Sequence, residues 1–97
     1  MRHELHPEAQ DEYESAIVWY EQRQQGLARR FFDAIETAID DAAEHPLRHP
    51  ILEQDVRRRL LRVFPYSVLY VAERDHVLVL ALMHNHREPG YWRSRIG

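Results

Sequence analysis

Two stretches in the first half of the chain carry apolar residues at helical spacing. In the first stretch these residues share one side of a helix, at Ala9, Tyr13, Ala16, Ile17 and Tyr20. Pro7 suits the first position of a helix, so we expect a helix over residues 7–23, followed by a left-handed stop at Gly26. The same spacing resumes at Leu27 and lasts until Pro46. The short link between the stretches predicts an antiparallel helical hairpin.

The second half of the chain changes to the pattern of β-strands. Residues 46–56 contain two Pro and no apolar face, so we expect a loop there. Beyond the loop, stretches rich in Val, Leu, Tyr and Phe predict three antiparallel strands, at Leu60–Phe64, Ser67–Ala72 and Val77–Met83. The last of them is apolar on both faces, which is typical of a strand that is buried on both faces or paired on both sides. Residues 1–5 can add a strand at an edge of the sheet.

The order strand, helix, helix, three strands and tail predicts an α+β fold. We expect an antiparallel helical hairpin packed on one face of a small antiparallel sheet (β-α-α-β-β-β), followed by a short basic aromatic C-terminal tail. The other face of the sheet is expected to stay open and to carry basic side chains. A chain of 97 residues has room for one hydrophobic core, so residues 1–97 are expected to form one domain.

Composition excludes several classes of protein. The chain has no Cys, which excludes disulfides, thiolate zinc sites and Cys nucleophiles. No apolar run approaches the length of a membrane-spanning helix, and no signal segment follows the N-terminus. The default expectation is therefore a soluble cytoplasmic protein without a membrane partner.

Charge is distributed unevenly along the chain, although the net charge is only −3. Residues 1–45 hold 11 acidic residues and 4 Arg, whereas residues 46–97 hold 5 acidic residues and 9 Arg. All 13 basic residues are Arg, which suits the bidentate binding of carboxylates and phosphates. A genome rich in GC codons explains the absence of Lys equally well. The C-terminal half is thus a candidate basic surface.

The first candidate site is the cluster of Arg57, Arg58, Arg59 and Arg62. Because side chains alternate between the faces of a strand, Arg57 and Arg59 are expected on one face, with Arg58 and Arg62 on the other. Such a cluster can bind phosphates or an acidic peptide. The alternative is a solvated edge strand whose charges prevent aggregation.

The second candidate site is the run from His84 to Arg87, which includes His86. Together with Tyr91, these side chains can supply the base, the cation and the acid that phosphoryl transfer at a ribose requires. The alternative is that they only hydrogen-bond the strand end and the tail in place. Two His without a third marked ligand do not predict a metal site, and no cofactor is expected.

Aromatic side chains in the tail and on the first helix are a third feature. Tyr91, Trp92 and Arg93 offer stacking faces and a cation, as nucleic-acid-binding proteins do. We favour the alternative, in which the tail is a lid that packs its aromatic side chains over the sheet. Trp19 lies off the main apolar stripe of the first helix, where it can be exposed for a partner.

A series of short motifs extends over nearly the whole chain. In order, it comprises His6-Pro7-Glu8-Ala9, Trp19-Tyr20-Glu21, Gly26-Leu27, Arg30-Phe31, Pro46, Arg58-Arg59, Phe64-Pro65-Tyr66, Tyr70, Val79-Leu80-Ala81, His84, Arg87, Pro89, Tyr91-Trp92 and Arg95. In these motifs the chain resembles the RelE/ParE superfamily of toxins from bacterial toxin-antitoxin (plasmid stabilisation) modules. The motif Phe-Pro-Tyr with a downstream His-x-x-Arg-x-Pro-x-Tyr-Trp is most similar to ParE-like members.

The resemblance implies the fold predicted above, growth arrest as the activity, and an antitoxin whose C-terminal segment folds over the toxin. RelE-like members are ribosome-dependent mRNA endonucleases with an Arg near the start of the strand that here begins at Ser67. ParE-like members act on DNA gyrase. Because Ser67 replaces that Arg and Lys is absent, we expect a gyrase inhibitor.

Two alternatives to a gyrase inhibitor remain open from the sequence. A RelE-like nuclease would use His84, His86, Arg87 and Tyr91 as catalytic residues. A non-toxic regulatory binding module would use only the binding surface. In each case that surface is expected to include Arg58, Arg59, Arg62, Tyr66, Trp92 and Arg93.

Overall fold

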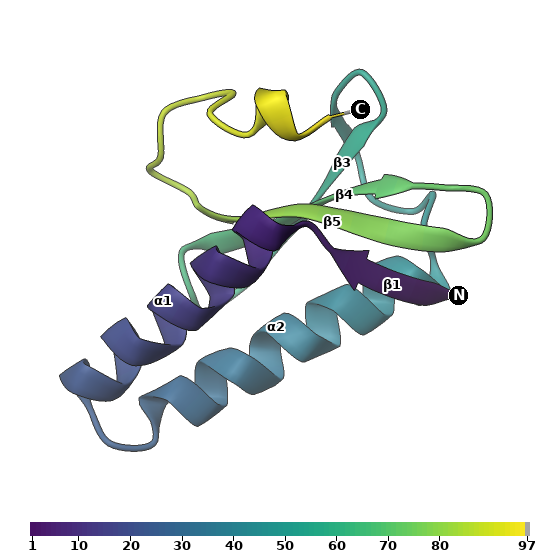
Figure 1. Cartoon of the computed structure of the whole chain (residues 1–97). Coiled ribbons are helices and arrows are strands. Elements are labelled where there is room, and N and C mark those ends of the chain that lie inside the picture. The colour runs from purple at the N-terminus through teal and green to yellow at the C-terminus, as the bar shows by residue number, and fades with distance from the viewer. Residues whose placement is uncertain (97) are drawn as a thin grey trace.

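The computed structural model describes residues 1–96 and contains two helices packed on one face of a five-stranded sheet (Figure 1). The elements are β1 (Arg2–Leu5), α1 (Pro7–Arg23), α2 (Leu27–Glu44), β2 (Ile51–Glu53), β3 (Val56–Leu60), β4 (Tyr66–Ala72), β5 (His76–His84) and one 3₁₀ turn (Arg93–Arg95). The strand order is β1-β5-β4-β3-β2. All neighbours are antiparallel except β1, which runs parallel to β5. The predicted α+β fold is confirmed.

Local sequence signals place the ends of both helices. Pro7 is the first residue of α1, and the Nδ1 atom of His6 accepts the backbone N–H of Glu8 at 3.1 Å, which caps the helix. Gly26 has a φ of 86°, in the left-handed region that favours glycine, and lets the chain turn directly into α2. The predicted helical hairpin is therefore confirmed.

The strands that precede β4 differ from the prediction. The prediction of a strand at Leu60–Phe64 is wrong. Strand β3 occupies Val56–Leu60, and the chain leaves the sheet after Leu60. Phe64 instead packs its ring into the core, with its centroid 5.3 Å from that of Phe31. The loop predicted at 46–56 contains the short strand β2, which pairs with β3. Three consecutive Arg in β3 hide the alternation that marks a strand.

Both faces of the sheet carry an apolar core. Phe31, Ile35, Val68, Val79 and Leu82 are among the buried residues between the helices and the sheet. On the opposite face, Val56, Leu69, Leu80, Ala81, Met83 and Trp92 form a second buried cluster. Strand β5 contributes to both clusters and is paired on both sides, with β1 and β4. This confirms the interpretation of β5, from its apolar residues on both faces, as an interior strand of the sheet.

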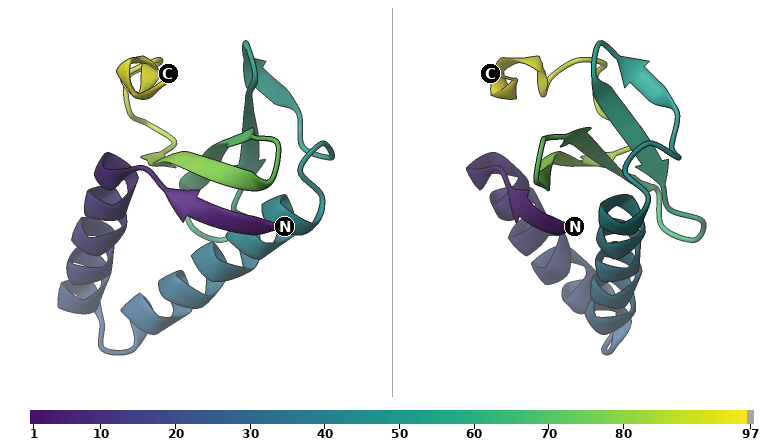
Figure 2. Two further views of the ribbon diagram at one scale, coloured as in Figure 1. Left: turned by 45° about the vertical axis from the view of Figure 1, so that its right-hand side comes forward. Right: turned by 90° about the vertical axis from the view of Figure 1, so that its right-hand side faces the viewer.

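The tail covers the second face of the sheet (Figure 2). We call residues 89–96 the C-terminal strap. Trp92 of the strap is 2% exposed, so the expectation that this face stays open is wrong, and the expectation of a lid is confirmed. The reason is that the exposed apolar surface of the sheet is large enough to bury the Trp92 ring. Within the described residues, neither helix is long and apolar enough to cross a membrane.

Candidate functional site

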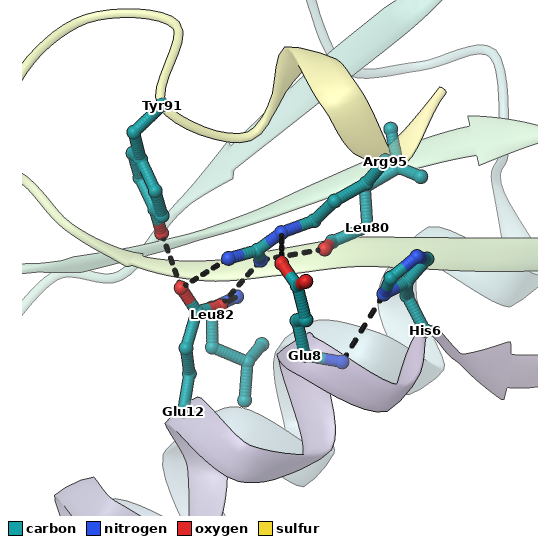
Figure 3. A network of polar contacts seen from close by, with 7 residues as sticks. All are labelled: His6, Glu8, Glu12, Leu80, Leu82, Tyr91 and Arg95. Carbon is teal, nitrogen blue, oxygen red and sulfur yellow. Dashed lines mark hydrogen bonds and ion pairs between the residues drawn. The ribbon is translucent and has the colours of Figure 1, made fainter. Parts of the chain in front are cut away.

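Glu12 of α1 is the centre of a polar network that joins the helix, β5 and the C-terminal strap (Figure 3). Its Oε1 atom accepts the Leu82 backbone N–H at 3.0 Å and Arg95 Nη1 at 2.9 Å. Its Oε2 atom accepts the Tyr91 hydroxyl at 2.6 Å and Arg95 Nη2 at 3.1 Å. A carboxylate has about four acceptor sites, so these contacts saturate Glu12. It has no lone pair left for a ligand or for a proton-transfer role.

Arg95 and Glu12 also close an exposed edge of β5. Pairing with β1 ends at Val79, so the later backbone groups of β5 have no strand beside them on this side. Arg95 Nη1 donates to the Leu80 carbonyl oxygen at 3.0 Å, and Glu12 accepts the Leu82 N–H. Because these edge groups are already bonded, another strand cannot add here without displacing the two side chains.

Arg95 is the most buried charge of this network, with 7% of its side chain exposed. Burial alone would lower the pKa of its guanidinium, but the hydrogen bonds and negative charge of Glu12 outweigh that effect and raise it above its usual range. Arg95 Nε also donates to Glu8 at 2.8 Å. The contact therefore keeps its charge and holds the strap against the start of α1.

Two Arg guanidinium groups lie close to the Tyr91 ring. The Arg87 guanidinium lies 3.9 Å from its ring centroid and the Arg95 guanidinium 5.1 Å. Burial, followed by the hydrogen bond to Glu12, raises the pKa of the Tyr91 hydroxyl well above its usual range. Its proton is thus committed to Glu12, and Tyr91 is poorly placed to act as the general acid of a nuclease.

His84 and Arg87 line a pocket of about 480 Å³ between α1, the start of β4 and the end of β5. The pocket residues are Glu12, Ser15, Ala16, Trp19, Tyr20, Pro65, Tyr66, Leu82, His84, Arg87 and Tyr91. The Nδ1 atom of His84 accepts the His86 backbone N–H at 3.1 Å, which leaves Nε2 as the nitrogen available to a ligand. Of the four predicted catalytic residues, the structure brings His84, Arg87 and Tyr91 to one pocket, while His86 is exposed outside its lining.

The Arg side chains of β3 are engaged inside the protein. Arg58 donates from Nε to the Ser67 hydroxyl at 2.9 Å and from Nη2 to Asn85 Oδ1 at 3.2 Å. Ser67 is fully buried and donates to the same Asn85 oxygen at 2.7 Å. On the helix side, Arg59 Nε donates to Asp41 at 2.9 Å. Arg58 and Arg59 therefore connect β3 to neighbouring elements, on opposite faces as predicted.

The remaining predicted binding residues do not form one surface. Arg62 lies beyond the end of β3 in a hollow that it shares with Arg30 and Arg59, so the prediction that it shares the face of Arg58 is wrong. Arg93 of the strap makes a bidentate contact with Glu53 of β2, at 2.6 and 2.7 Å. Trp92 is buried and Tyr66 lines the pocket. The bend after β3 reverses the expected alternation at Arg62.

Sequence reasoning missed Glu12 and Glu53 as partners of the strap, and it missed Arg95 as the strap residue that binds Glu12. The weak signal was a pair of carboxylates one turn apart on α1, Glu8 and Glu12, in a chain with a basic tail. Helix acids usually point to solvent, so spacing alone gives no reason to pair them with a residue 83 positions away. Among the described residues, no group of three His, Asp or Glu is placed to hold a metal ion.

Comparison with protein families finds a match to the model described as ParE toxin of type II toxin-antitoxin system, parDE, over residues 4–89. Comparison with curated proteins finds no match. The matched range includes both helices, β2 to β5 and the pocket residues as far as Arg87, and it ends at the start of the strap. Since the match spans most of the chain, the protein belongs to the ParE family of toxins from type II toxin-antitoxin systems.

Proposed function

We propose that this ParE-family toxin arrests growth by acting on DNA gyrase and that a cognate antitoxin neutralises it. Family membership implies an antitoxin partner. The observation that supports a binding mode of action is the saturation of Glu12, which ties up the Tyr91 hydroxyl and the Arg95 guanidinium. A gyrase inhibitor requires a binding surface and no set of proton-transfer groups.

RNA cleavage makes stricter demands than binding. It needs a base, an acid and a cation around one scissile phosphate. The Tyr91 proton is held by Glu12, and Ser67 is buried where the resemblance predicts an Arg in nuclease members. These features favour the gyrase proposal over a ribosome-dependent mRNA endonuclease.

Two assays on one preparation of the toxin test this proposal. We expect inhibition of gyrase supercoiling, or accumulation of gyrase-cleaved DNA, and intact mRNA in a translating extract. A preparation in which Phe64→Ala has unfolded the chain serves as the inactive control, because Phe64 is buried against Phe31 and Tyr20. Primer-extension stops at codon boundaries with unchanged supercoiling would contradict the proposal.

The nuclease remains the second candidate, because His84 and Arg87 both line the pocket and His84 Nε2 makes no hydrogen bond among the described residues. In that case His84→Ala and Arg87→Ala would abolish mRNA cleavage. Arg74→Ala, an exposed change in the turn between β4 and β5, would leave it unchanged. The nuclease is excluded if the unaltered toxin cleaves no mRNA while His84→Ala or Arg87→Ala loses gyrase inhibition.

Growth assays test the toxin-antitoxin assignment itself. We expect the chain alone to be poorly tolerated in bacteria and to be tolerated when an adjacent small gene product with an acidic, helix-forming C-terminus is expressed with it. Normal growth at high soluble expression without a partner would instead support a non-toxic regulatory module. This assay does not depend on whether gyrase or the ribosome is the target.

A further inference from the structure

We propose that a hollow between α2 and β3 is a binding site for the backbone phosphates of a nucleic-acid duplex. Three Arg line this hollow of about 390 Å³, which we call the arginine hollow: Arg30 from α2, Arg59 from β3 and Arg62 from the segment after β3. Among the described residues, no carboxylate contributes to its lining. It shares no residue with the pocket that contains His84 and Arg87.

Two of the three guanidinium groups have no partner inside the described part of the chain. Arg30 and Arg62 are exposed, and their side chains make no hydrogen bond or ion pair with another described residue. Arg59 is anchored, because its Nε atom donates to Asp41 at 2.9 Å and its Nη1 atom to the Leu60 carbonyl oxygen at 2.6 Å. The hollow therefore offers two complete guanidinium forks beside one cation that is held in place.

The nearest carboxylates on α2 are paired with Arg. Asp41 contacts both Arg59 and Arg48, and the hydrogen bond from Arg59 lowers the pKa of its carboxyl below the usual value. Asp33 pairs with Arg29 at 3.1 Å. These acids are thus compensated by cations outside the two free forks, so an anion that enters the hollow meets a net positive charge.

The arrangement favours a phosphate over a carboxylate. One guanidinium fork satisfies a planar carboxylate, whereas a tetrahedral phosphate presents oxygen atoms in several directions and accepts from several Arg at once. In the hollow the Arg come from different elements, and the wall between them is apolar, from Leu61, Val63 and Phe64. This wall adds no side-chain acceptor that would compete with the phosphate oxygens.

The extent of the cationic surface favours a polyanion over one free phosphate. Arg48, 57% exposed, contacts the same Asp41 as Arg59, so the cations reach from Arg30 at least to the level of Asp41. These positions on α2 are separated by about 16 Å of helix. Along one strand of a duplex, that distance covers about four to five phosphates.

The lining also favours a duplex over a single strand. Proteins that bind single strands stack the bases on exposed aromatic rings. Among the described residues that line the hollow, Phe64 is the one aromatic residue, and it is 8% exposed because its ring packs into the core. A ligand can therefore be held here through its backbone and not through stacking of its bases.

Fluorescence anisotropy of a labelled DNA duplex of about 20 base pairs, titrated with the full chain at several salt concentrations, tests the site. Because the chain has a net charge of −3, it has no general attraction for DNA, and binding must come from a local cluster of cations. Three phosphate contacts predict that the logarithm of the affinity falls with the logarithm of the salt concentration with a slope of about −3. Absence of saturable binding at about 50 mM salt would overturn the proposal.

Variants assign the binding to named side chains. Arg30→Gln and Arg62→Gln should each weaken binding and reduce the slope by about 1, which is the effect of one lost phosphate contact. Arg62→Lys keeps the charge and should keep the slope. Thermal midpoints should stay unchanged in these variants, because neither guanidinium has a partner among the described residues.

Control variants carry the same change elsewhere in the chain. Arg74→Gln in the turn between β4 and β5, and Arg87→Gln in the other pocket, should leave the affinity and the slope unchanged. If Arg87→Gln reduced the slope while Arg30→Gln and Arg62→Gln did not, the duplex would bind at the other pocket and the proposal would fail.

Two competitors identify the source of the anion. We expect inorganic phosphate to displace the duplex only at a much higher concentration, and polyglutamate with the same number of charges to compete more weakly than an unlabelled duplex. Displacement by inorganic phosphate at equal concentration would make the hollow a site for a small phosphate ligand. Equal competition by polyglutamate would make it a site for an acidic protein, and either result overturns the proposal.

The inference goes beyond the proposed function, because duplex binding is measured without gyrase, ribosomes or antitoxin. Gyrase inhibition without duplex binding refutes the arginine hollow and leaves the function intact. Duplex binding with the expected slope, in a chain that does not inhibit gyrase, refutes the gyrase proposal and leaves the hollow intact.

Discussion

At the scale of single residues, Glu12 joins segments that are far apart in the chain. It bonds the backbone of β5 and two side chains of the strap, at separations of 70 to 83 positions. These bonds satisfy a partly buried carboxylate and a nearly buried guanidinium at the same time. Removing Glu12 therefore leaves the Arg95 guanidinium with Glu8, which is 59% exposed, as its remaining acidic partner.

We predict that Glu12→Gln lowers the free energy of unfolding by about 3 kcal/mol, because it leaves the nearly buried Arg95 guanidinium with only the exposed carboxylate of Glu8 as its counter-charge. Tyr91→Phe removes only one hydrogen bond to the same carboxylate and should cost about 1 kcal/mol. Urea unfolding followed by circular dichroism measures both. If Glu12→Gln and Tyr91→Phe lost equal amounts of unfolding free energy, the charge of Glu12 would contribute nothing to stability beyond a hydrogen bond.

His49 gives a prediction about pH. Burial of its ring lowers its pKa from the usual 6.5, an effect that Asp41, 3.1 Å away, only partly opposes. The unfolded chain then binds a proton more readily than the folded one, so this residue's contribution to stability is complete above about 6.5 and declines as the pH falls below it.

We therefore expect the thermal midpoint of the protein to decrease between about pH 8 and pH 5, and to decrease less in His49→Gln. Arg48 and Arg59 also contact Asp41, and both are retained in His49→Gln. His45, exposed nearby, is the control position, since His45→Gln should leave the decrease unchanged. Identical curves for the wild type and His49→Gln would contradict this account.

At the scale of elements, the C-terminal strap completes the fold of the sheet. Arg93 binds Glu53 of β2, Arg95 binds Glu8 and Glu12 of α1, and Trp92 fills the space between these two attachments. The strap also places Tyr91 and Arg87 at the wall of the pocket. Its packing therefore connects the stability of the second core to the shape of the candidate site.

We predict that Trp92→Ala costs about 3 to 5 kcal/mol, the usual loss for a buried aromatic side chain. Trp19→Ala is the matched control, because Trp19 is half exposed and its removal should change stability by about 0.5 kcal/mol or less. Hydrogen exchange at the Leu82 amide, which Glu12 accepts, should increase in Trp92→Ala if the strap detaches. A loss as small as that of Trp19→Ala would show that the strap is not part of the core.

At the scale of the whole molecule, much of the basic charge of the C-terminal half is used internally. Arg57, Arg58, Arg59, Arg93 and Arg95 all hydrogen-bond other parts of the chain. Among the described residues of this half, Arg62 and Arg87 are the cations left exposed beside a hollow or pocket without an ion pair. They lie in different hollows, so the free basic charge is divided between two sites.

We expect Arg62→Ala and Arg87→Ala each to reduce toxicity or antitoxin binding. Each should change the free energy of unfolding by no more than about 0.5 kcal/mol, as ordinary surface substitutions do. Arg59→Ala should instead lower the midpoint, since it leaves Asp41 without its shortest contact. Growth assays and thermal unfolding of the same variants separate the two classes. Collapse of Arg62→Ala or Arg87→Ala would assign these residues to structure.

The sequence by itself determined the features that depend on local patterns. Both helices, their separation at Gly26, the interior strand β5 and the family resemblance were read from periodicity, glycine or proline positions, and short motifs. These signals are reliable because each is carried by neighbouring residues. The strand Leu60–Phe64 was misplaced because the Arg of β3 are polar residues that stay partly buried through their own hydrogen bonds.

Only the tertiary structure decided how the candidate residues are grouped. It paired Arg95 with Glu12 across the molecule, closed the second face of the sheet with Trp92 and separated Arg58 from Arg62. The saturation of Glu12 and the place of Tyr91 in the lining of the pocket follow from these contacts. Residues 83 positions apart meet because packing brings α1, β5 and the strap together, and no local pattern in the chain encodes that meeting.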